Sequence, residues 1–213
     1  SQPGRTVIPV TYMNSDADLK AFCGRNGGIV CTSSNAGAVF DWAYARGDAV
    51  LFFPDEHLGW NTGRKWGLTA DETVLWDPRY EVGGLTLGEL GQARLILWKG
   101  YCHVHTRFKT AHIGKAREDD PEVKVVVHPE CAADVVDAAD EVGSTGFICK
   151  YVDDAPPGTS IAIGTEINLI DRLADDYKDK RIFPLTRSLC PTCIKSASTT
   201  CCGHLRRRGC MYL

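Results

Sequence analysis

The sequence predicts an α/β protein built from two consecutive, pseudo-symmetric αβα units with mainly parallel sheets. Short and almost continuously apolar runs, typical of strands buried on both faces, alternate with stretches of helical character. The same order of polar strand ends then occurs twice along the 213 residues. We place the units at residues 1–97 and 98–186, and we treat 187–213 as a cysteine-bearing segment and a tail.

Four strands are expected in the first unit, each an apolar run that ends in polar residues. They are residues 7–11, 28–30, 49–53 and 94–98. Helices are expected after the first strand, from about Asp16, and after the second, through Trp42. The segment from Gly59 to Gly91 is rich in Gly and Trp, and Trp76-Asp77-Pro78 within it is interpreted as a loop without assigned chemistry.

The second unit repeats this order. Its expected strands are residues 123–127, 160–163 and 181–185, with a short segment before Gly143. Strand 123–127 ends in His128-Pro129-Glu130, and strand 181–185 leads to Cys190 as strand 94–98 leads to Cys102. The spacings differ by several residues, so the likeness is structural rather than a clean sequence repeat.

Composition narrows the class of protein. A net charge of −3 without a long basic stripe argues against nucleic-acid binding, and no apolar run is long enough for a membrane span. The chain opens on Ser1, so we expect its initiator end to be missing or processed, and no signal peptide is visible. Ten cysteines without a secretory signal favour metal or cluster ligation in the cytoplasm over disulfides.

The repeated strand ends predict one shared site. Ligands of open parallel sheets bind beyond the carboxyl ends of the strands, where both units place polar residues. The turns 32–34 and 143–145 carry hydroxyl groups and lead into helices, so they could seat anions, although an N-cap role for each remains open. Cys102 and Cys190 could each donate one thiolate to an iron–sulfur cluster, which usually takes four, so a further unit is expected.

Eight motifs in series, from about Val7 to Thr192, resemble quinolinate synthase. The motifs are Tyr12-Met13-Asn14, Cys31-Thr32-Ser33-Ser34-Asn35-Ala36, Pro54-Asp55-Glu56-His57-Leu58-Gly59, Gly100-Tyr101-Cys102-His103-Val104-His105, His128-Pro129-Glu130-Cys131, Gly143-Ser144-Thr145, Gly164-Thr165-Glu166 and Cys190-Pro191. One departure is Gly146, where the family commonly has a second serine.

The resemblance implies three pseudo-symmetric αβα domains around one [4Fe–4S] cluster, with one cysteine from each. This chain would contain the second and third domains and lack the first. The implied activity condenses iminoaspartate with dihydroxyacetone phosphate to quinolinate in NAD biosynthesis, with an open iron as Lewis acid. L-aspartate oxidase or aspartate dehydrogenase would supply the iminoaspartate. On its own, the chain is expected to be incomplete or inactive.

The resemblance also implies roles for single residues. Cys102 and Cys190 would be cluster ligands, with the third ligand absent from this chain. Glu130 would move protons as the acid/base, with Tyr12 and His128 beside it in catalysis. The implied substrate-binding residues are Tyr12, Asn14, Ser33, His105, His128, Ser144, Thr145 and Thr165.

The tail departs from the expected helix after Thr192. Dropping one base from suitable codons converts Met-Tyr-Lys-Ile-Ser into the observed residues 193–197, so we expect a frameshift there, which the gene sequence would test. On this interpretation Cys193, Cys201, Cys202 and Cys210 carry no function.

Two other function classes remain open. One is a zinc protein that uses the cysteine-rich tail, starting from Cys190-Pro191-Thr192-Cys193. The other is a cluster-free αβ module that binds a small dicarboxylate or phosphate. The scattered thiols Cys23, Cys31, Cys131 and Cys149 are expected to be small buried residues in any of these classes.

Overall fold

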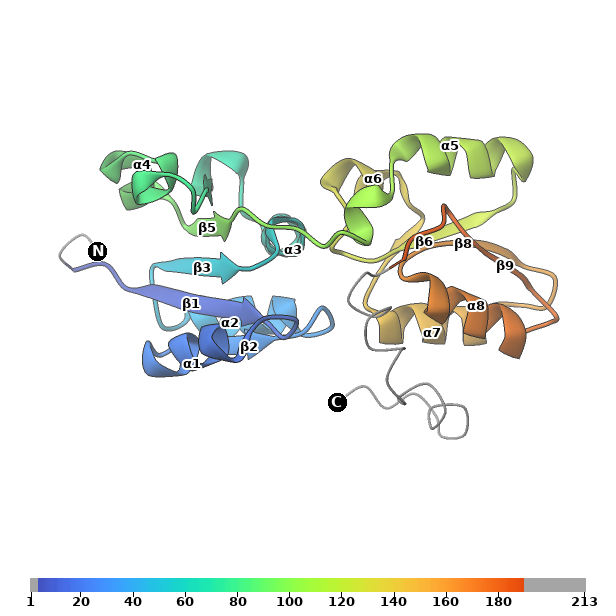
Figure 1. The fold of residues 1–213 in the computed structure, drawn as a ribbon, viewed down its shortest axis with the longest axis horizontal. Coiled ribbons are helices and arrows are strands. Elements are labelled where there is room, and N and C mark those ends of the chain that lie inside the picture. Colours follow the sequence, from blue (N-terminus) through green and yellow to red (C-terminus); the bar gives the residue numbers. More distant parts are fainter. Residues whose placement is uncertain (1–3, 190–213) are drawn as a thin grey trace.

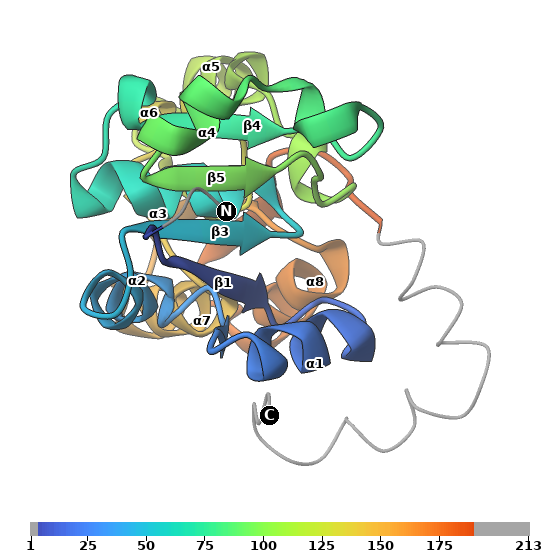
Figure 2. The ribbon, with the colours of Figure 1, turned by 90° about the vertical axis from the view of Figure 1, so that its left-hand side faces the viewer.

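The computed structural model describes residues 4–189 and shows two parallel sheets side by side along the chain (Figure 1). The first has the order β2-β1-β3-β5-β4, and every neighbouring pair is parallel. Figure 2 shows β1, β3, β4 and β5 pointing the same way. Its strands are β1 Val7–Tyr12, β2 Ile29–Cys31, β3 Ala49–Phe53, β4 Thr73–Trp76 and β5 Leu95–Trp98. Its helices are α1 Ala17–Arg25, α2 Ala36–Tyr44, α3 Glu56–Trp66, η1 Ala70–Glu72, η2 Glu81–Gly84 and α4 Leu87–Gln92.

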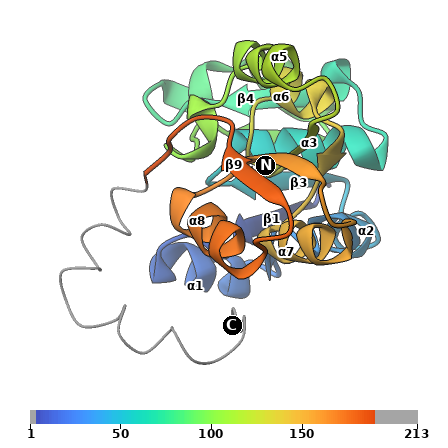
Figure 3. The same cartoon turned by 90° about the vertical axis from the view of Figure 1, so that its right-hand side faces the viewer.

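The second sheet has the order β7-β6-β8-β9 and is also parallel throughout. Its strands are β6 Lys124–Val127, β7 Glu141–Val142, β8 Ser160–Gly164 and β9 Arg181–Pro184. The helices are η3 His105–Arg107, α5 Thr110–Asp119, α6 Ala133–Ala138, α7 Thr145–Asp154 and α8 Ile167–Asp176. Figure 3 shows α8 beside β9. The predicted fold class, two αβα units with parallel sheets, is confirmed, whereas the boundaries at 97/98 and 186/187 stay a prediction.

Both faces of the second sheet are buried, which explains its run of valines. Side chains alternate between the faces of a strand, so Val125 and Val127 pack toward α5 and α6, while Val126 packs toward α7 and α8. Figure 1 shows these helix pairs on opposite sides of the sheet. A strand covered in this way needs apolar residues on both faces, as Val125, Val126 and Val127 provide after the exposed Lys124 at the start of β6.

Helices α2 and α3 pack against one face of the first sheet. Phe40 and Phe52 lie at the centre of this core and are fully buried. Close approach of α3 to the sheet depends on Gly59, because a Cβ there would lie 2.5 Å from Leu97 Cδ2.

The loop interpretation of Trp76 is wrong, because Trp76 is the last residue of β4 and pairs with Trp98. Strand β4 lies at the edge of the sheet and has only four residues, with Leu75 40% exposed. Its apolar run, Val74-Leu75-Trp76, has only three residues and directly precedes Asp77-Pro78, so the sequence pattern favours a loop.

Helix α3 joins the two units by packing beside α6 (Figure 1). The buried Asn61 side chain donates hydrogen bonds of 2.8 Å to the carbonyls of Pro129 and of Cys131. One turn along α3, Arg64 makes a two-pronged ion pair with Asp137 at 2.8 and 3.0 Å. Asn61 therefore fixes the turn that carries Glu130 against the first unit.

Among residues 4–189, the structure contains no helix that is both long and apolar enough to cross a membrane.

Candidate functional site at the carboxyl ends of the two sheets

Tyr12 and His128 stand at the carboxyl ends of equivalent strands, as the last residue of β1 and the first residue after β6. Thr11 pairs with Phe53, the last residue of β3, and Val127 pairs with Gly164, the last residue of β8. The next residues, Tyr12 and His128, therefore occupy matching positions in the two sheets. This register supports the internal repeat inferred from the sequence.

The Glu130 carboxylate contacts two stacked imidazole rings at their Nδ1 atoms. Its Oε2 atom is 3.1 Å from His105 Nδ1 and 3.2 Å from His128 Nδ1. The two rings are stacked, with centroids 4.4 Å apart and an interplanar angle of 17°. All three side chains are almost fully buried, with exposures of 6% for His105, 2% for His128 and 5% for Glu130. Residues that are 25 positions apart in the sequence thus form one compact acid–base cluster.

Hydroxyl groups from both units extend this cluster. His128 Nε2 lies 3.2 Å from Ser33 Oγ, which belongs to the first unit. His105 Nε2 lies 3.3 Å from Thr165 Oγ1, which directly follows β8. A continuous series of polar contacts therefore runs from Ser33 through both histidines and Glu130 to Thr165. His128 Nδ1 also accepts the backbone N–H of Glu130 at 3.3 Å, whereas His105 Nδ1 faces the carboxylate without a hydrogen bond.

The two imidazoles differ in charge at neutral pH. Burial alone would lower the pKa of His105, but its contacts with Cys102 and Glu130 outweigh burial and raise the pKa to about 9. Burial lowers the pKa of His128, and the positive charge of His105 adds to this effect. Burial would raise the pKa of Glu130, yet the two histidines outweigh it and hold that pKa well below its usual range. The cluster therefore combines a charged His105, a neutral His128 and an ionised carboxylate.

Asp55 fixes the loop that carries Cys102. The Asp55 carboxylate is buried, with Oδ1 accepting the Leu58 N–H at 2.7 Å and Oδ2 accepting the Cys102 N–H at 2.9 Å. The first bond caps α3, and the second ties the Cys102 loop to the same turn. Burial and the charge of Glu130 raise the pKa of the Asp55 carboxyl. No role for Asp55 was expected from the sequence, although an aspartate directly before a helix is a typical N-cap signal.

The loop that carries Cys102 lies close to the turn that precedes α3. The Gly100 carbonyl accepts the Glu56 N–H at 2.8 Å, and a Cβ at Gly100 would lie 2.4 Å from the Pro54 oxygen. The second unit has a matching bond, because the Ser188 carbonyl accepts the Ile167 N–H at 3.2 Å. Gly100 and Ser188 each stand two residues before a candidate cluster cysteine. Cys190 itself lies outside the described residues.

One group of side chains in the described part of the chain could hold a metal ion. The donor atoms of Cys102, His105 and Glu130 all lie within 4.8 Å of one another. They offer a thiolate, an imidazole nitrogen and a carboxylate oxygen, a set that suits transition metals.

Tyr12 and Asn14 lie beside the cluster on the first unit. Asn14 Nδ2 donates to the Tyr12 hydroxyl at 3.3 Å. Burial, together with the charge of Glu130, raises the pKa of the Tyr12 phenol, against an opposing hydrogen bond with Ser33. Tyr12 is therefore a neutral hydrogen-bond donor at physiological pH.

Ser144 and Thr145 are not joined to the cluster by any hydrogen bond between described residues. Ser144 Oγ instead accepts the Phe147 N–H at 3.2 Å and caps α7, which is the alternative that the sequence left open. The thiols of Cys23, Cys31 and Cys131 are buried as expected, whereas Cys149 is only partly buried.

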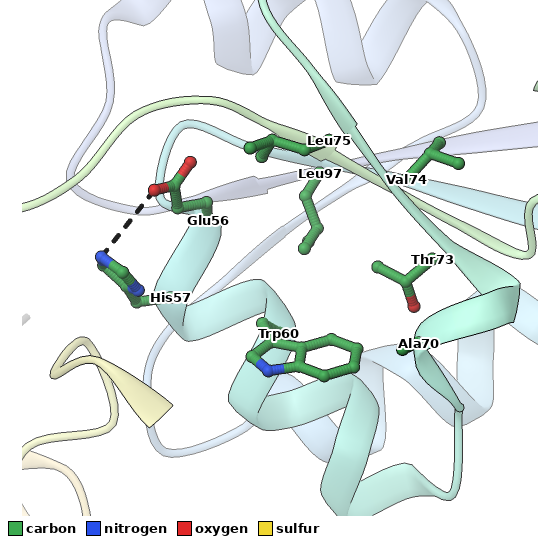
Figure 4. A pocket seen from close by; sticks show the side chains of 8 residues that line it. All are labelled: Glu56, His57, Trp60, Ala70, Thr73, Val74, Leu75 and Leu97. Atoms are coloured by element: carbon green, nitrogen blue, oxygen red, sulfur yellow. Dashed lines mark ion pairs between the residues drawn. The ribbon is translucent and has the colours of Figure 1, made fainter. Parts of the chain in front are cut away.

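A cavity of about 300 Å³ lies elsewhere, between α3 and strands β4 and β5 (Figure 4). Its walls are mainly apolar, with the Trp60 ring opposite Val74 and Leu97, and the Glu56–His57 pair at one side (Figure 4). It shares no residue with the histidine–glutamate cluster, so we do not assign the chemistry to it.

A comparison with protein families matches residues 1–209 to the family described as "NadA: Quinolinate synthetase A protein". This chain belongs to the quinolinate synthase family. The match extends into the tail, where the expected frameshift, the zinc alternative and the four tail cysteines all lie outside the described residues.

Similar curated proteins bear the name quinolinate synthase. The one from Corynebacterium glutamicum is 55% identical over 186 residues, which are 87% of this chain and 47% of the relative. The one from Halobacterium salinarum is 52% identical over 191 residues, 90% of this chain and 50% of the relative. The one from Rhodopirellula baltica is 50% identical over 185 residues, 86% and 47% respectively. The chain thus spans about half the length of these relatives.

Proposed function

We propose that this chain supplies the second and third domains of a quinolinate synthase, which makes quinolinate for NAD biosynthesis. The family assignment supports this function, and one structural observation carries it. Glu130 is held ionised by contacts with a charged and a neutral imidazole, at the same sheet edge where the Cys102 loop arrives. The first domain would come from the part of the relatives that this chain does not span.

The cofactor of the proposed enzyme is a [4Fe–4S] cluster. Cys102 and Cys190 would provide two thiolates, and the first domain would provide the third. The surroundings of Cys102 fit a metal-bound thiolate, because its backbone is tied to Asp55 and its Sγ lies near the His105 imidazole. When bound, the cluster would supply a Lewis-acidic iron that polarises a substrate oxygen.

The proposed substrates, iminoaspartate and dihydroxyacetone phosphate, are both anions. The buried positive charge on His105 would attract them, and the hydroxyls of Ser33 and Thr165 would donate hydrogen bonds to carboxylate or phosphate oxygens. Tyr12 and Asn14 would contact the same ligand from the first unit. Ser144 and Thr145, at the N-terminus of α7, would bind a further anionic group.

Proton transfer would use Glu130 together with the two histidines. An ionised Glu130 can accept a proton from a substrate carbon or nitrogen, while the protonated His105 can give one to a departing hydroxyl. Neutral His128, fixed by Ser33 and Glu130, would keep the carboxylate oriented. Condensation with loss of water and tautomerisation needs both kinds of transfer, which a single group cannot perform at the same moment.

Two parts of the proposal concern the setting of the enzyme. L-aspartate oxidase or aspartate dehydrogenase would supply iminoaspartate, and the site of action would be the cytoplasm. Neither a membrane nor a nucleic acid is a proposed partner.

The test is a chimera in which residues 4–189 replace the matching segment of the Corynebacterium glutamicum relative. After anaerobic reconstitution with iron and sulfide, it should show broad visible absorbance and form quinolinate from the two substrates. The unchanged relative is the positive control. A chimera that binds the cluster as the relative does, yet makes no quinolinate, would overturn the proposed function of this chain.

A further inference from the structure

A sulfur, a nitrogen and an oxygen atom that can each bind a metal lie close together in the fold. Sγ of Cys102, a ring nitrogen of His105 and a carboxylate oxygen of Glu130 lie within 4.8 Å of one another. Cys102 lies on the loop after β5, His105 begins η3 three residues later, and Glu130 follows β6. No other group of three or more such side chains gathers in this way between residues 4 and 189.

His105 Nδ1 is a buried atom that lacks a hydrogen-bond partner. It lies 3.1 Å from Glu130 Oε2, but the two are not in hydrogen-bonding geometry. A hydrogen bond needs the donor directed at the acceptor, whereas two ligands of one ion direct their lone pairs at the ion. Nitrogen and oxygen ligands of a tetrahedral zinc ion are about 3.4 Å apart, close to the distance found here.

A further contact positions each of the three candidate ligand residues. His105 Nε2 lies 3.3 Å from Thr165 Oγ1, which leaves Nδ1 free for a metal. The backbone N–H of Glu130 donates to His128 Nδ1 at 3.3 Å. The backbone of Cys102 is fixed by Asp55 at 2.9 Å. Metal ligands in proteins typically have such outer hydrogen bonds, which orient them and raise affinity.

We propose that Cys102, His105 and Glu130 bind a single thiophilic divalent cation of the zinc class when no cluster is present. A thiolate with an imidazole and one carboxylate selects zinc, cobalt or ferrous iron over magnesium and calcium, which prefer oxygen ligands throughout. Three protein ligands leave a fourth position for water. Binding releases two protons to solvent, one from the Cys102 thiol and one from the His105 imidazolium, because both groups must give up a proton to bind the ion.

This site goes beyond the proposed synthase activity and has one consequence for it. The Cys102 thiolate would serve both the ion and the cluster, so the two cannot be bound together. Zinc should therefore slow cluster assembly, while the ion site itself needs neither iron, sulfide, substrate nor the first domain.

Cobalt(II) is the probe, because cobalt bound to a thiolate absorbs in the near ultraviolet and, when four-coordinate, strongly in the visible. We expect both absorptions when cobalt is added anaerobically to the metal-free 213-residue chain, and their loss when zinc is added. Cys102→Ser should remove the charge-transfer band. Glu130→Gln and His105→Gln should weaken cobalt binding at least tenfold. The matched controls are Cys149→Ser and Glu122→Gln, the same substitutions outside the proposed site. They should bind cobalt as the wild type does.

A second variant separates this site from the tail. Replacing Cys193, Cys201, Cys202 and Cys210 together by serine should leave the cobalt bands in place. Bands that vanish in this variant but persist in Cys102→Ser would overturn the proposal, as would equal affinity of wild type and Glu130→Gln. X-ray absorption of the wild-type cobalt form needs no variant: one sulfur with lighter ligands is expected, and two or more sulfurs would contradict the assignment.

Discussion

Replacing Asp55 by Asn separates the two bonds made by one buried carboxylate. Asn keeps an oxygen that can accept the Leu58 N–H, and it is as good a helix cap as Asp. Its amide nitrogen would then face the Cys102 N–H, so two donors would meet where a donor and an acceptor met before. The pKa of Asp55 is raised to about 7, so the carboxylate is fully charged only above that pH. A hydrogen bond to a charged group contributes about 1.5–3 kcal/mol, so above that pH we expect the free energy of unfolding to fall by about 2 kcal/mol. Asp55→Ala loses the cap as well, which adds about 1 kcal/mol.

Urea unfolding together with amide hydrogen exchange provides the assay. In Asp55→Asn the Cys102 amide should lose protection while the Leu58 amide keeps it, and in Asp55→Ala both should lose it. Asp48→Asn is the matched control, since the exposed Asp48 carboxylate accepts the Thr6 N–H at 2.8 Å. The Asp48→Asn control should lower the free energy of unfolding by less than about 0.5 kcal/mol. Unchanged protection of the Cys102 amide in Asp55→Asn would refute the claim that Asp55 fixes this loop.

Three further predictions concern the cluster and the contact between the units. Glu130→Gln in the chimera should reduce turnover about 10²-fold or more without loss of cluster absorbance, because a positioned base is lost; equal loss of cluster would mean a structural role. Asn61→Ala should lower the free energy of unfolding by about 1–3 kcal/mol in urea, because two carbonyls lose their donor, whereas the exposed Asn168→Ala should cost less than half of that. The pKa of His105 is raised from 6.5 to about 9, so its contribution to stability should be complete below pH 6.5 and lost as the pH rises through 9. Urea unfolding from pH 6 to 10 should show this decline in the wild type, and His105→Gln should lack it.

The core of the fold could be predicted because its signal is local. The apolar run Val125-Val126-Val127 indicates a strand with both faces covered, and the structure places Val126 on the opposite face to Val125 and Val127. The edge strand β4 could not be predicted in this way, since its residues are half exposed and its partner β5 is about 20 positions away.

The candidate site could be predicted only in part. Parallel strands bring their carboxyl ends to one edge of a sheet, so a shared edge for His128 and Thr165 follows from the strand pattern, while Ser33 stands at the matching edge of the first sheet. The stacking of His105 on His128 does not follow, because it depends on how the loop after β5 folds back. That path is set by Asp55, whose bond to Cys102 spans 47 positions. A local pattern shows the cap at α3 but not its second, distant partner.

The central claim is that one ionised carboxylate contacts two stacked imidazoles of unlike charge, and nitrogen NMR of the histidine rings tests it most directly. In the ¹⁵N-labelled 213-residue chain at neutral pH, with signals assigned from His105→Gln and His128→Gln, His105 should give the shifts of an imidazolium. His128 should give those of a neutral ring with one protonated nitrogen. Two neutral rings, two charged rings, or the reverse assignment would contradict the account.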